Sequence, residues 1–266
     1  MPSFQARDGV RLHYEVEGAG PPLVLHLGAG CDADLWRAAG YVEPLSRTFT
    51  CVLFDHRGHG LSDHPTSVEA NHLDRYADDV IALVEHLGHS RVTYFGWSNG
   101  VQVGLKAASQ HPDAFDALVL SGAIPPRRTR EEVAAGIPGR IAALRDKGWW
   151  EVIGDMIPAE KLPVPQWFID RVLATDIEPF IAWSMARPDW NWSPWDAMPN
   201  IRAPSLLLAG EMEDPDDLVG EAARLMPNAK RVRVPDREHI NAFLYSEFVV
   251  PRVLEFLRRA VRAQAG

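Results

Sequence analysis

The sequence is 266 residues long, with 46% hydrophobic and 24% charged residues and a formal net charge of −9. This composition is that of a soluble globular chain, and an acidic balance without a Lys/Arg stripe argues against a nucleic-acid partner. The two cysteines form no disulfide framework, and no Cys or His pairs have zinc spacing. We expect no signal peptide, and the sequence lacks the run of about 18 apolar residues that a membrane-spanning helix needs. We therefore expect a cytoplasmic protein with reduced thiols and without metal or membrane contact.

Alternating polar and apolar residues at the N-terminus predict a β-hairpin at a sheet edge, over residues 3–17 and turning at Gly9. Short continuous apolar runs predict further strands, buried on both faces. These runs are 23–27, 51–54, 92–95, 117–120 and 205–209, and residues 230–234 are predicted to form a further strand. Helical spacing falls between them, at about 34–46, 71–87, 101–108, 217–225 and 240–262. Asp32 or Asp34 is the expected N-cap of the first of these helices. The alternation predicts an α/β fold, a mostly parallel eight-stranded sheet with helices on both faces.

The alternation of predicted strands and helices stops after residue 122. Residues 123–203 are rich in proline, show several short helical patterns and hold seven of the nine tryptophans. We expect this segment to form a helical cap inserted into a core made of residues 1–122 and 204–266. Its first residues include the only tight basic cluster, which we interpret as a solvated loop. This cluster is Arg127, Arg128 and Arg130.

The sequence Gly96-Trp97-Ser98-Asn99-Gly100 stands between a predicted strand and a predicted helix. In that context the Gly-x-Ser-x-Gly pattern forms a nucleophile elbow, a sharp turn that presents the serine hydroxyl at the carboxyl edge of the sheet. Such sheets place their chemistry beyond the carboxyl ends of their strands. We therefore predict that Ser98 is a catalytic nucleophile.

A serine hydroxyl needs a base to remove its proton, and histidine serves best because its pKa lies near neutrality. His239 follows the last predicted strand and opens the last helix, so its ring can swing over a serine on the central strand. Of the other nine histidines, His56, His59 and His64 follow the strand at 51–54 and are expected at most to border the pocket. His239 is the predicted base.

The base needs an anion to hold its tautomer, and an acid-rich turn, 211–217, follows the strand at 205–209. The predicted orienting acid is Glu213 or Asp214, and the sequence leaves both open. The oxyanion of a tetrahedral intermediate needs N–H donors. We expect these from the backbone of Asn99, which follows the nucleophile, and of Ala29, in the loop after the strand at 23–27.

The order of Ser98, acid and His239 on this strand pattern resembles the α/β-hydrolase superfamily, and the likeness runs over nearly the whole chain. The segment 55–63, Asp-His-Arg-Gly-His-Gly-Leu-Ser-Asp, resembles the family's D-x-R-G-x-G-x-S loop, and the helical insertion resembles its cap. Aspartate is the family's usual orienting acid, which favours Asp214, whereas spacing from Gly210 favours Glu213. Within the superfamily the chain is most similar to small esterases, enol-lactonases and C–C bond hydrolases. The resemblance implies no cofactor.

The leading hypothesis is a serine hydrolase of carboxylic esters or lactones that works through an acyl-enzyme on Ser98. Trp97 beside the nucleophile and the tryptophan-rich cap indicate a pocket for a small, largely apolar substrate. Two alternatives remain open: a C–C bond hydrolase acting on a vinylogous diketone, and a small-molecule binding protein that retains the triad. A homodimer is compatible with this hypothesis.

Overall fold

The computed structural model describes residues 1–122, 124–156 and 163–264, and these contain a single eight-stranded sheet in the order β1-β2-β4-β3-β5-β6-β7-β8. The strands are β1 (Ser3–Gln5), β2 (Arg11–Glu17), β3 (Pro22–His26), β4 (Thr50–Phe54), β5 (Val92–Trp97), β6 (Phe115–Ser121), β7 (Ser205–Gly210) and β8 (Ala229–Val234). The N-terminal hairpin turns at Gly9, and β2 joins the sheet antiparallel to β4. Every later pairing is parallel, which confirms the predicted fold class.

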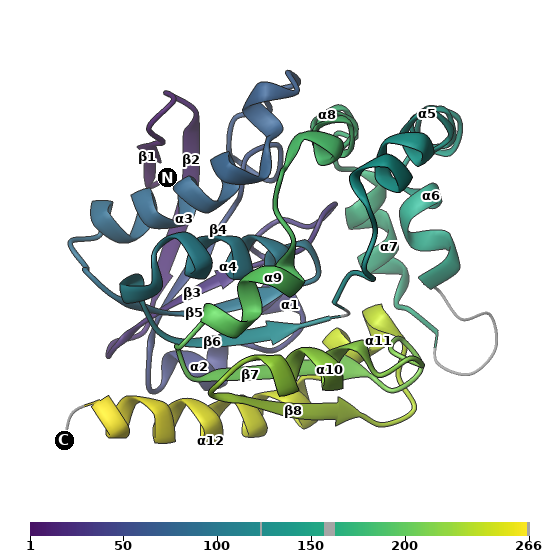
Figure 1. Ribbon diagram of the computed structural model, residues 1–266. Coiled ribbons are helices and arrows are strands. Elements are labelled where there is room, and N and C mark those ends of the chain that lie inside the picture. The colour runs from purple at the N-terminus through teal and green to yellow at the C-terminus, as the bar shows by residue number, and fades with distance from the viewer. Residues whose placement is uncertain (123, 157–162, 265–266) are drawn as a thin grey trace.

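Helices cover both faces of the sheet (Figure 1). The helices α3 and α4 pack together on one face with α10, while α2, α11 and α12 contact strands from the other. The core helices are α1 (Leu35–Ala38), α2 (Val42–Ser46), α3 (Leu73–His86), α4 (Asn99–Gln110), α10 (Leu218–Leu225), α11 (His239–Leu244) and α12 (Ser246–Gln264). Two short 3₁₀ turns, η1 (Glu69–Asn71) and η2 (Pro112–Ala114), flank α3 and β6. None of the described helices combines the length and the apolarity required to cross a membrane.

Two predicted helices are each divided in two. The helix expected at 34–46 breaks at Gly40, whose φ of +80° lies in the left-handed region, so that α1 and α2 form instead. The helix expected at 240–262 is interrupted between α11 and α12. The expected N-cap hydrogen bond of Asp34 is also absent, because this carboxylate binds Arg37 and Arg171. The Asp34 side chain thus forms ion pairs in place of a capping hydrogen bond to the backbone of α1.

The described parts of the segment between β6 and β7 form helices joined by short loops, as the cap prediction requires. It contains α5 (Arg130–Lys147), α6 (Trp150–Ile153), η3 (Gly154–Met156), α7 (Gln166–Leu173), α8 (Glu178–Ala186), η4 (Arg187–Asp189), α9 (Pro194–Ala197) and η5 (Met198–Asn200). Residues 123 and 157–162 of the predicted cap lie outside the described residues. In Figure 1, α5, α6, α7 and α8 gather at one corner, beyond the arrowhead of β6. The boundaries of a separate cap domain stay a prediction.

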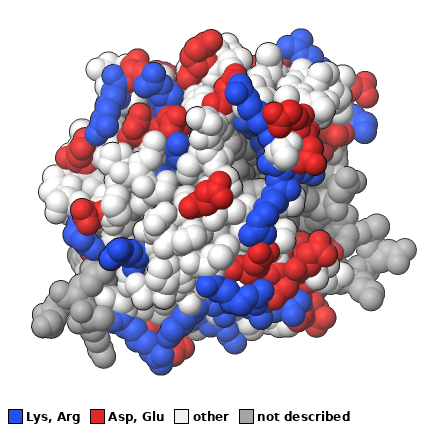
Figure 2. Space-filling model, viewed as in Figure 1, with Lys and Arg blue, Asp and Glu red and all other residues white. Residues whose placement is uncertain are grey.

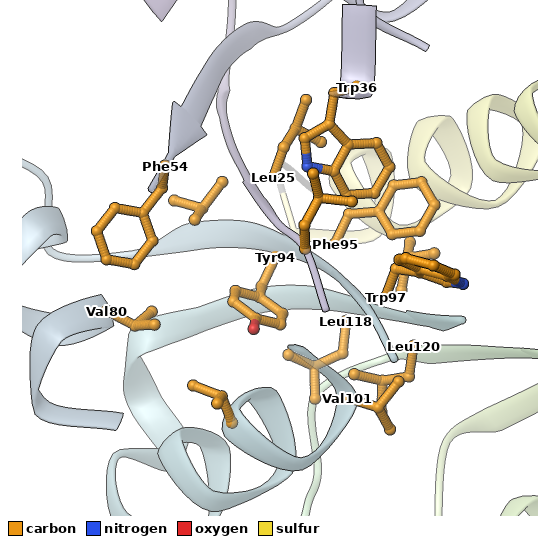
Figure 3. Close-up of a cluster of buried hydrophobic side chains, with 14 of the residues drawn as sticks. Leu25, Trp36, Phe54, Val80, Tyr94, Phe95, Trp97, Val101, Leu118 and Leu120 are labelled. Carbon is orange, nitrogen blue, oxygen red and sulfur yellow. The ribbon is translucent and has the colours of Figure 1, made fainter. Parts of the chain in front are cut away.

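The core is densest around β5, which is buried along its whole length. Because side chains alternate across a strand, Tyr94 points to one face and Phe95 to the other (Figure 3). Phe95 packs against Trp36, with ring centroids 4.8 Å apart, while the Tyr94 ring lies beside His26 on β3. The central strand is thus clamped from both faces, which makes its carboxyl end a rigid platform.

Candidate active site

The turn after β5 has the strained geometry of a nucleophile elbow. Ser98 has φ +57° and ψ −116°, a conformation that non-glycine residues rarely adopt and that clusters at functional sites. The turn is possible because both flanking glycines lack a side chain. A Cβ on Gly96 would stand 2.4 Å from the carbonyl oxygen of Gly100, and one on Gly100 would stand 2.5 Å from that of His26. The predicted turn is confirmed in its geometry.

The ring of His239 reaches this serine from the far end of the sheet. After β8 the chain turns at Asp236, which has φ +53°, and His239 begins α11. Its Nε2 lies 2.9 Å from Oγ of Ser98, and its Nδ1 contacts the carboxylate of Glu213. The side chain of His239 is 14% exposed and that of Glu213 is 6% exposed. The imidazole is therefore accessible from the cavity while its acidic partner is sheltered.

Of the two candidate acids, the structure brings only Glu213 to His239. The second carboxylate oxygen of Glu213 accepts the amide hydrogen of Gly210 at 3.0 Å, which fixes the side chain. Asp214 instead accepts the amide hydrogens of Leu218 and Val219, at 2.8 and 3.0 Å, at the start of α10. The aspartate is thus occupied by a helix N-terminus. The spacing from Gly210, rather than the preference for aspartate, indicated the right neighbour.

Trp97 is placed differently from the expectation that it lines the substrate pocket. It shares the face of Phe95, two residues earlier on β5, and is only 3% exposed. Its ring stacks on that of His239, with centroids 4.8 Å apart, and on Phe243 at 4.4 Å. Trp97 therefore supports the imidazole from behind and is not among the residues that line the cavity at Ser98.

The two expected oxyanion donors flank the nucleophile. Ala29, in the loop after β3, and Asn99, the first residue of α4, line the same cavity as Ser98. The loop comes this close because Gly28 has no side chain: a Cβ there would stand 2.5 Å from Cβ of Ser98. This placement is compatible with the predicted role of both backbone amides.

Sequence reasoning missed a residue that holds this loop. Nε2 of His59 accepts the amide hydrogen of Gly30 at 2.8 Å, directly after Ala29. An imidazole accepts a hydrogen bond only when it is neutral, and burial lowers the pKa of His59 to about 4, so the ring stays neutral at pH 7. The only sequence signal was its place in the segment that resembles the family loop.

The rest of that loop has a structural role. The carboxylate of Asp55 accepts the amide hydrogens of Ala33 at 2.6 Å and of Leu61 at 3.0 Å, so it ties together the loops after β3 and β4. The guanidinium of Arg57 is 1% exposed and binds the carboxylates of Asp79 and Asp8. These contacts fix the backbone that carries His59.

The candidate active site opens into a cavity of about 530 Å³, a volume suited to a small molecule. The core supplies the reactive end of this cavity, and α5, α6, η3, α8 and η4 supply the opposite wall. The lining residues are Ala29, Ser98, Asn99, Gln102, Pro125, Arg140, Val152, Met156, Phe180, Trp183, Arg187, Met212, Glu213, Pro215, Glu238 and His239. Within the described ranges, no group of three or more His, Cys, Asp or Glu residues is arranged to hold a metal ion.

Comparison with known proteins agrees with this architecture. A model of the α/β-hydrolase fold family matches residues 21–147. The bifunctional esterase/perhydrolase DCH of Acinetobacter calcoaceticus is 27% identical, with 95% of this chain and 98% of that protein covered. The chain spans about half the length, or less, of the curated relatives to which it is 30% identical or more.

Solved structures extend the likeness to the whole fold. A thermophilic esterase from Thermogutta terrifontis superposes with a TM-score of 0.82 at 23% identity, covering 98% of this chain and 99% of that one. The enol-lactonase from Burkholderia xenovorans LB400 gives 0.79 at 22% identity, covering 97% and 100%. The chain therefore has the α/β-hydrolase fold, and its residues 21–147 match the model of that family.

Proposed function

We propose that the protein is a serine hydrolase that cleaves carboxylic esters or lactones through an acyl-enzyme on Ser98. The observation that carries this proposal is the continuous chain of contacts from the Glu213 carboxylate through both ring nitrogens of His239 to the Ser98 hydroxyl. Such a chain needs no further group to activate the serine.

Acylation follows from the orientation of the imidazole. Because Nδ1–H of His239 donates a hydrogen bond to the Glu213 carboxylate, Nε2 is the free base and takes the proton of the Ser98 hydroxyl as Oγ attacks the carbonyl carbon. The amides of Ala29 and Asn99 would stabilise the resulting oxyanion. The tetrahedral intermediate then expels the alkoxide, which leaves as the alcohol after receiving the proton from Nε2.

Deacylation uses the same groups in the reverse sense. Nε2 of His239 removes a proton from water, the hydroxide attacks the acyl carbon, and Oγ of Ser98 leaves and recovers the proton. The carboxylic acid is released. In a lactone the alcohol and the acid belong to one molecule, so a single hydroxy acid is the product.

The cavity and the relatives favour substrates of modest size. Apolar and aromatic side chains, among them Val152, Met156, Phe180 and Trp183, form much of the wall opposite Ser98. An esterase/perhydrolase is similar over nearly the whole chain, and esterase and enol-lactonase structures share the fold. These likenesses support an ester or lactone bond as the target.

A panel of 4-nitrophenyl and alkyl esters and of simple lactones tests the proposal, with Ser98→Ala as the control. We expect turnover by the native chain and a loss of at least about 1,000-fold in kcat in the variant. A fluorophosphonate should add covalently to Ser98, as measured by the mass of the intact protein. Saturable ligand binding without turnover, or turnover that survives Ser98→Ala, would contradict the proposal.

A further inference from the structure

Two arginines stand in the wall between the active-site cavity and its neighbour. A second cavity of about 600 Å³ adjoins the first, and the two share the lining residues Gln102, Pro125, Arg140 and Arg187. Arg140 comes from α5, and Arg187 begins η4 directly after α8. Both guanidinium groups therefore belong to the helical insertion, while Ser98 and His239 come from the sheet side of the same cavity.

Neither arginine has an acidic partner within the described part of the chain. Each is only partly exposed, and neither guanidinium group makes a hydrogen bond or an ion pair with a described residue. The Nε of Arg140 is buried without an acceptor there. Removing a charge from water without a partner costs free energy. An unpaired, partly buried guanidinium group therefore indicates a functional role, such as binding an anionic ligand.

The other arginines that pack into the protein are treated differently. Arg37, Arg57 and Arg171, which are buried or partly buried, each contact at least two carboxylates. These ion pairs tie one element to another and account for the charge. Arg237, which is also partly buried, donates to a backbone carbonyl instead. Among the partly buried arginines of the described residues, Arg140 and Arg187 are those whose side chains make neither a hydrogen bond nor an ion pair.

Their environment is positive. Burial, followed by the charges of Arg140 and Arg128, lowers the pKa of Arg187 to about 10. Burial and Arg128 also lower the pKa of Arg140, against the opposing influence of Glu151. Arg187 therefore remains cationic at neutral pH, although the neighbouring charge of Arg140 destabilises it.

Aromatic faces hold the two guanidinium groups in place. Arg140 lies over Phe180 at 5.5 Å, and Arg187 lies over Trp183 at 5.5 Å and over Trp190 at 5.6 Å. The indole N–H groups of Trp183 and Trp190 are buried with no acceptor among the described residues. This part of the wall is thus rich in hydrogen-bond donors and poor in acceptors.

The approach to the cavity is also basic, in a chain whose net charge is −9. The neighbouring cavity is lined by Arg127, Arg128 and Arg130 as well, of which Arg127 pairs with Glu221 and Arg130 with Asp189. A run of Lys and Arg side chains crosses the molecule beside a hollow right of centre (Figure 2). The acids on the active-site cavity, Glu213 and Glu238, lie at the catalytic end next to His239. Positive charge therefore gathers on the wall away from the triad.

We propose that Arg140 and Arg187 bind a carboxylate carried by the substrate at a distance from the bond that is cleaved. The preferred substrates are thus ester or lactone derivatives of dicarboxylic acids, which departs from the expectation of a largely apolar substrate. The proposal names the substrate class of the hydrolase proposed above and rests on that function. The planar fork of arginine matches a carboxylate with two parallel hydrogen bonds, and a monoanion loses less hydration than a phosphate dianion would.

A matched pair of substrates tests the proposal: the 4-nitrophenyl monoester of glutaric acid, which keeps a free carboxylate, and 4-nitrophenyl valerate, which ends in a methyl group. Both are assayed with the native chain, Arg140→Gln, Arg187→Gln and Arg145→Gln. Arg145 is the control, because it lies on the same helix α5, is exposed and lines neither cavity.

We expect the native chain to prefer the glutarate monoester by at least about tenfold in kcat/KM. Arg140→Gln and Arg187→Gln should each reduce kcat/KM for this ester by about 10- to 100-fold, mainly through KM, and should affect valerate hydrolysis far less. Arg145→Gln should behave as the native chain. Equal losses with both esters, or no preference for the carboxylate, would overturn the proposal.

Binding to the Ser98→Ala protein separates this proposal from the hydrolase proposal. Calorimetry should detect binding of glutarate but not of glutaramide. The heat of glutarate binding should vanish when the substitution Arg140→Gln is introduced into the Ser98→Ala protein. This result supports the carboxylate site even if no ester is turned over. Ester turnover without glutarate binding would support the hydrolase proposal and contradict the carboxylate site. Tighter binding of inorganic phosphate than of glutarate would also contradict the carboxylate site.

Discussion

The carboxylate of Glu213 contacts Nδ1 of His239, although 26 residues separate the two in the chain. They meet because β7 and β8 are parallel neighbours, so the turns that follow them lie side by side at the same edge of the sheet. The acid stands at the third position after Gly210, whose own amide binds the same carboxylate. One carboxylate thus fixes its turn and the imidazole together.

Separate substitutions of the two adjacent acids should have different effects. The change at Glu213 should reduce activity, and the change at Asp214 should reduce stability. Glu213→Gln removes the anion that holds the His239 tautomer, so we expect kcat to fall by about 100- to 10,000-fold with little loss of stability. Asp214→Ala removes the acceptor at the start of α10 and should lower the free energy of unfolding by about 1–2 kcal/mol. Steady-state kinetics and urea unfolding of both variants measure this. A larger loss of kcat in Asp214→Ala than in Glu213→Gln would reverse the assignment.

Trp97→Leu should lower kcat and leave KM nearly unchanged. The indole supports the His239 ring and does not line the cavity, so its loss should disturb the base rather than the substrate. Removing an aromatic pair of this kind weakens packing by about 0.5–1.5 kcal/mol beyond the area lost. Steady-state kinetics with one ester at several concentrations measure kcat and KM separately and so test this prediction. A selective rise in KM would indicate that the ring reaches the substrate after all.

A single methyl group at Gly28 should disable the site. The Cβ of Gly28→Ala would stand 2.9 Å from the Ser98 hydroxyl oxygen, so the loop that carries Ala29 must move. We expect at least about a 100-fold loss of kcat, since small displacements of catalytic groups are this costly. Gly136→Ala is the control: nothing lies within 4 Å of its Cβ in α5, and it should stabilise the helix by about 0.5–1 kcal/mol. Full activity in Gly28→Ala would show that the loop yields freely.

The protein should lose stability as the pH falls below about 6.5, because it buries neutral histidines. Burial lowers the pKa of His26 to about 3 and that of His59 to about 4, and it holds the pKa of His56 well below its usual 6.5. The unfolded chain takes up these protons first. The free energy of unfolding should therefore fall toward acid by up to about 4 kcal/mol per pH unit, about 1.4 for each proton.

Urea unfolding at pH 7, 6 and 5 measures this slope, and His56→Leu provides a check. Neither ring nitrogen of His56 has a partner among the described residues, so the substitution leaves no described group unpaired. It should flatten the dependence by about 1.4 kcal/mol per pH unit below pH 6.5. A free energy of unfolding that stays level from pH 7 to pH 5 would contradict the prediction.

Features fixed by local pattern could be predicted. The buried strands follow from continuous apolar runs, and the turn at Ser98 follows from two glycines at the places where a Cβ would collide. The position of His239 follows from sheet topology alone, because parallel strands deliver their following loops to one edge. Strand parity also places Trp97 beside Phe95, away from the cavity, although the neighbouring nucleophile suggested otherwise.

Features that depend on a specific tertiary contact could not be predicted. The choice between Glu213 and Asp214 depends on how one turn folds around Gly210. The hydrogen bond from Gly30 to His59 joins two loops that are distant in the sequence. The placement of Arg140 beside Arg187 in one wall of the cavity depends on the packing of α5 against η4, to which no sequence periodicity points.

Leu118 on β6 lies opposite Ser205 on β7, so the two strands pair directly even though the whole helical segment separates them in the chain. In topological terms that segment is one long excursion which leaves the sheet and returns to the adjacent place in it. Its replacement would break none of the hydrogen bonds between strands. Specificity can therefore diverge by exchange of a single contiguous cassette, while the reactive machinery, encoded on either side of it, is inherited intact.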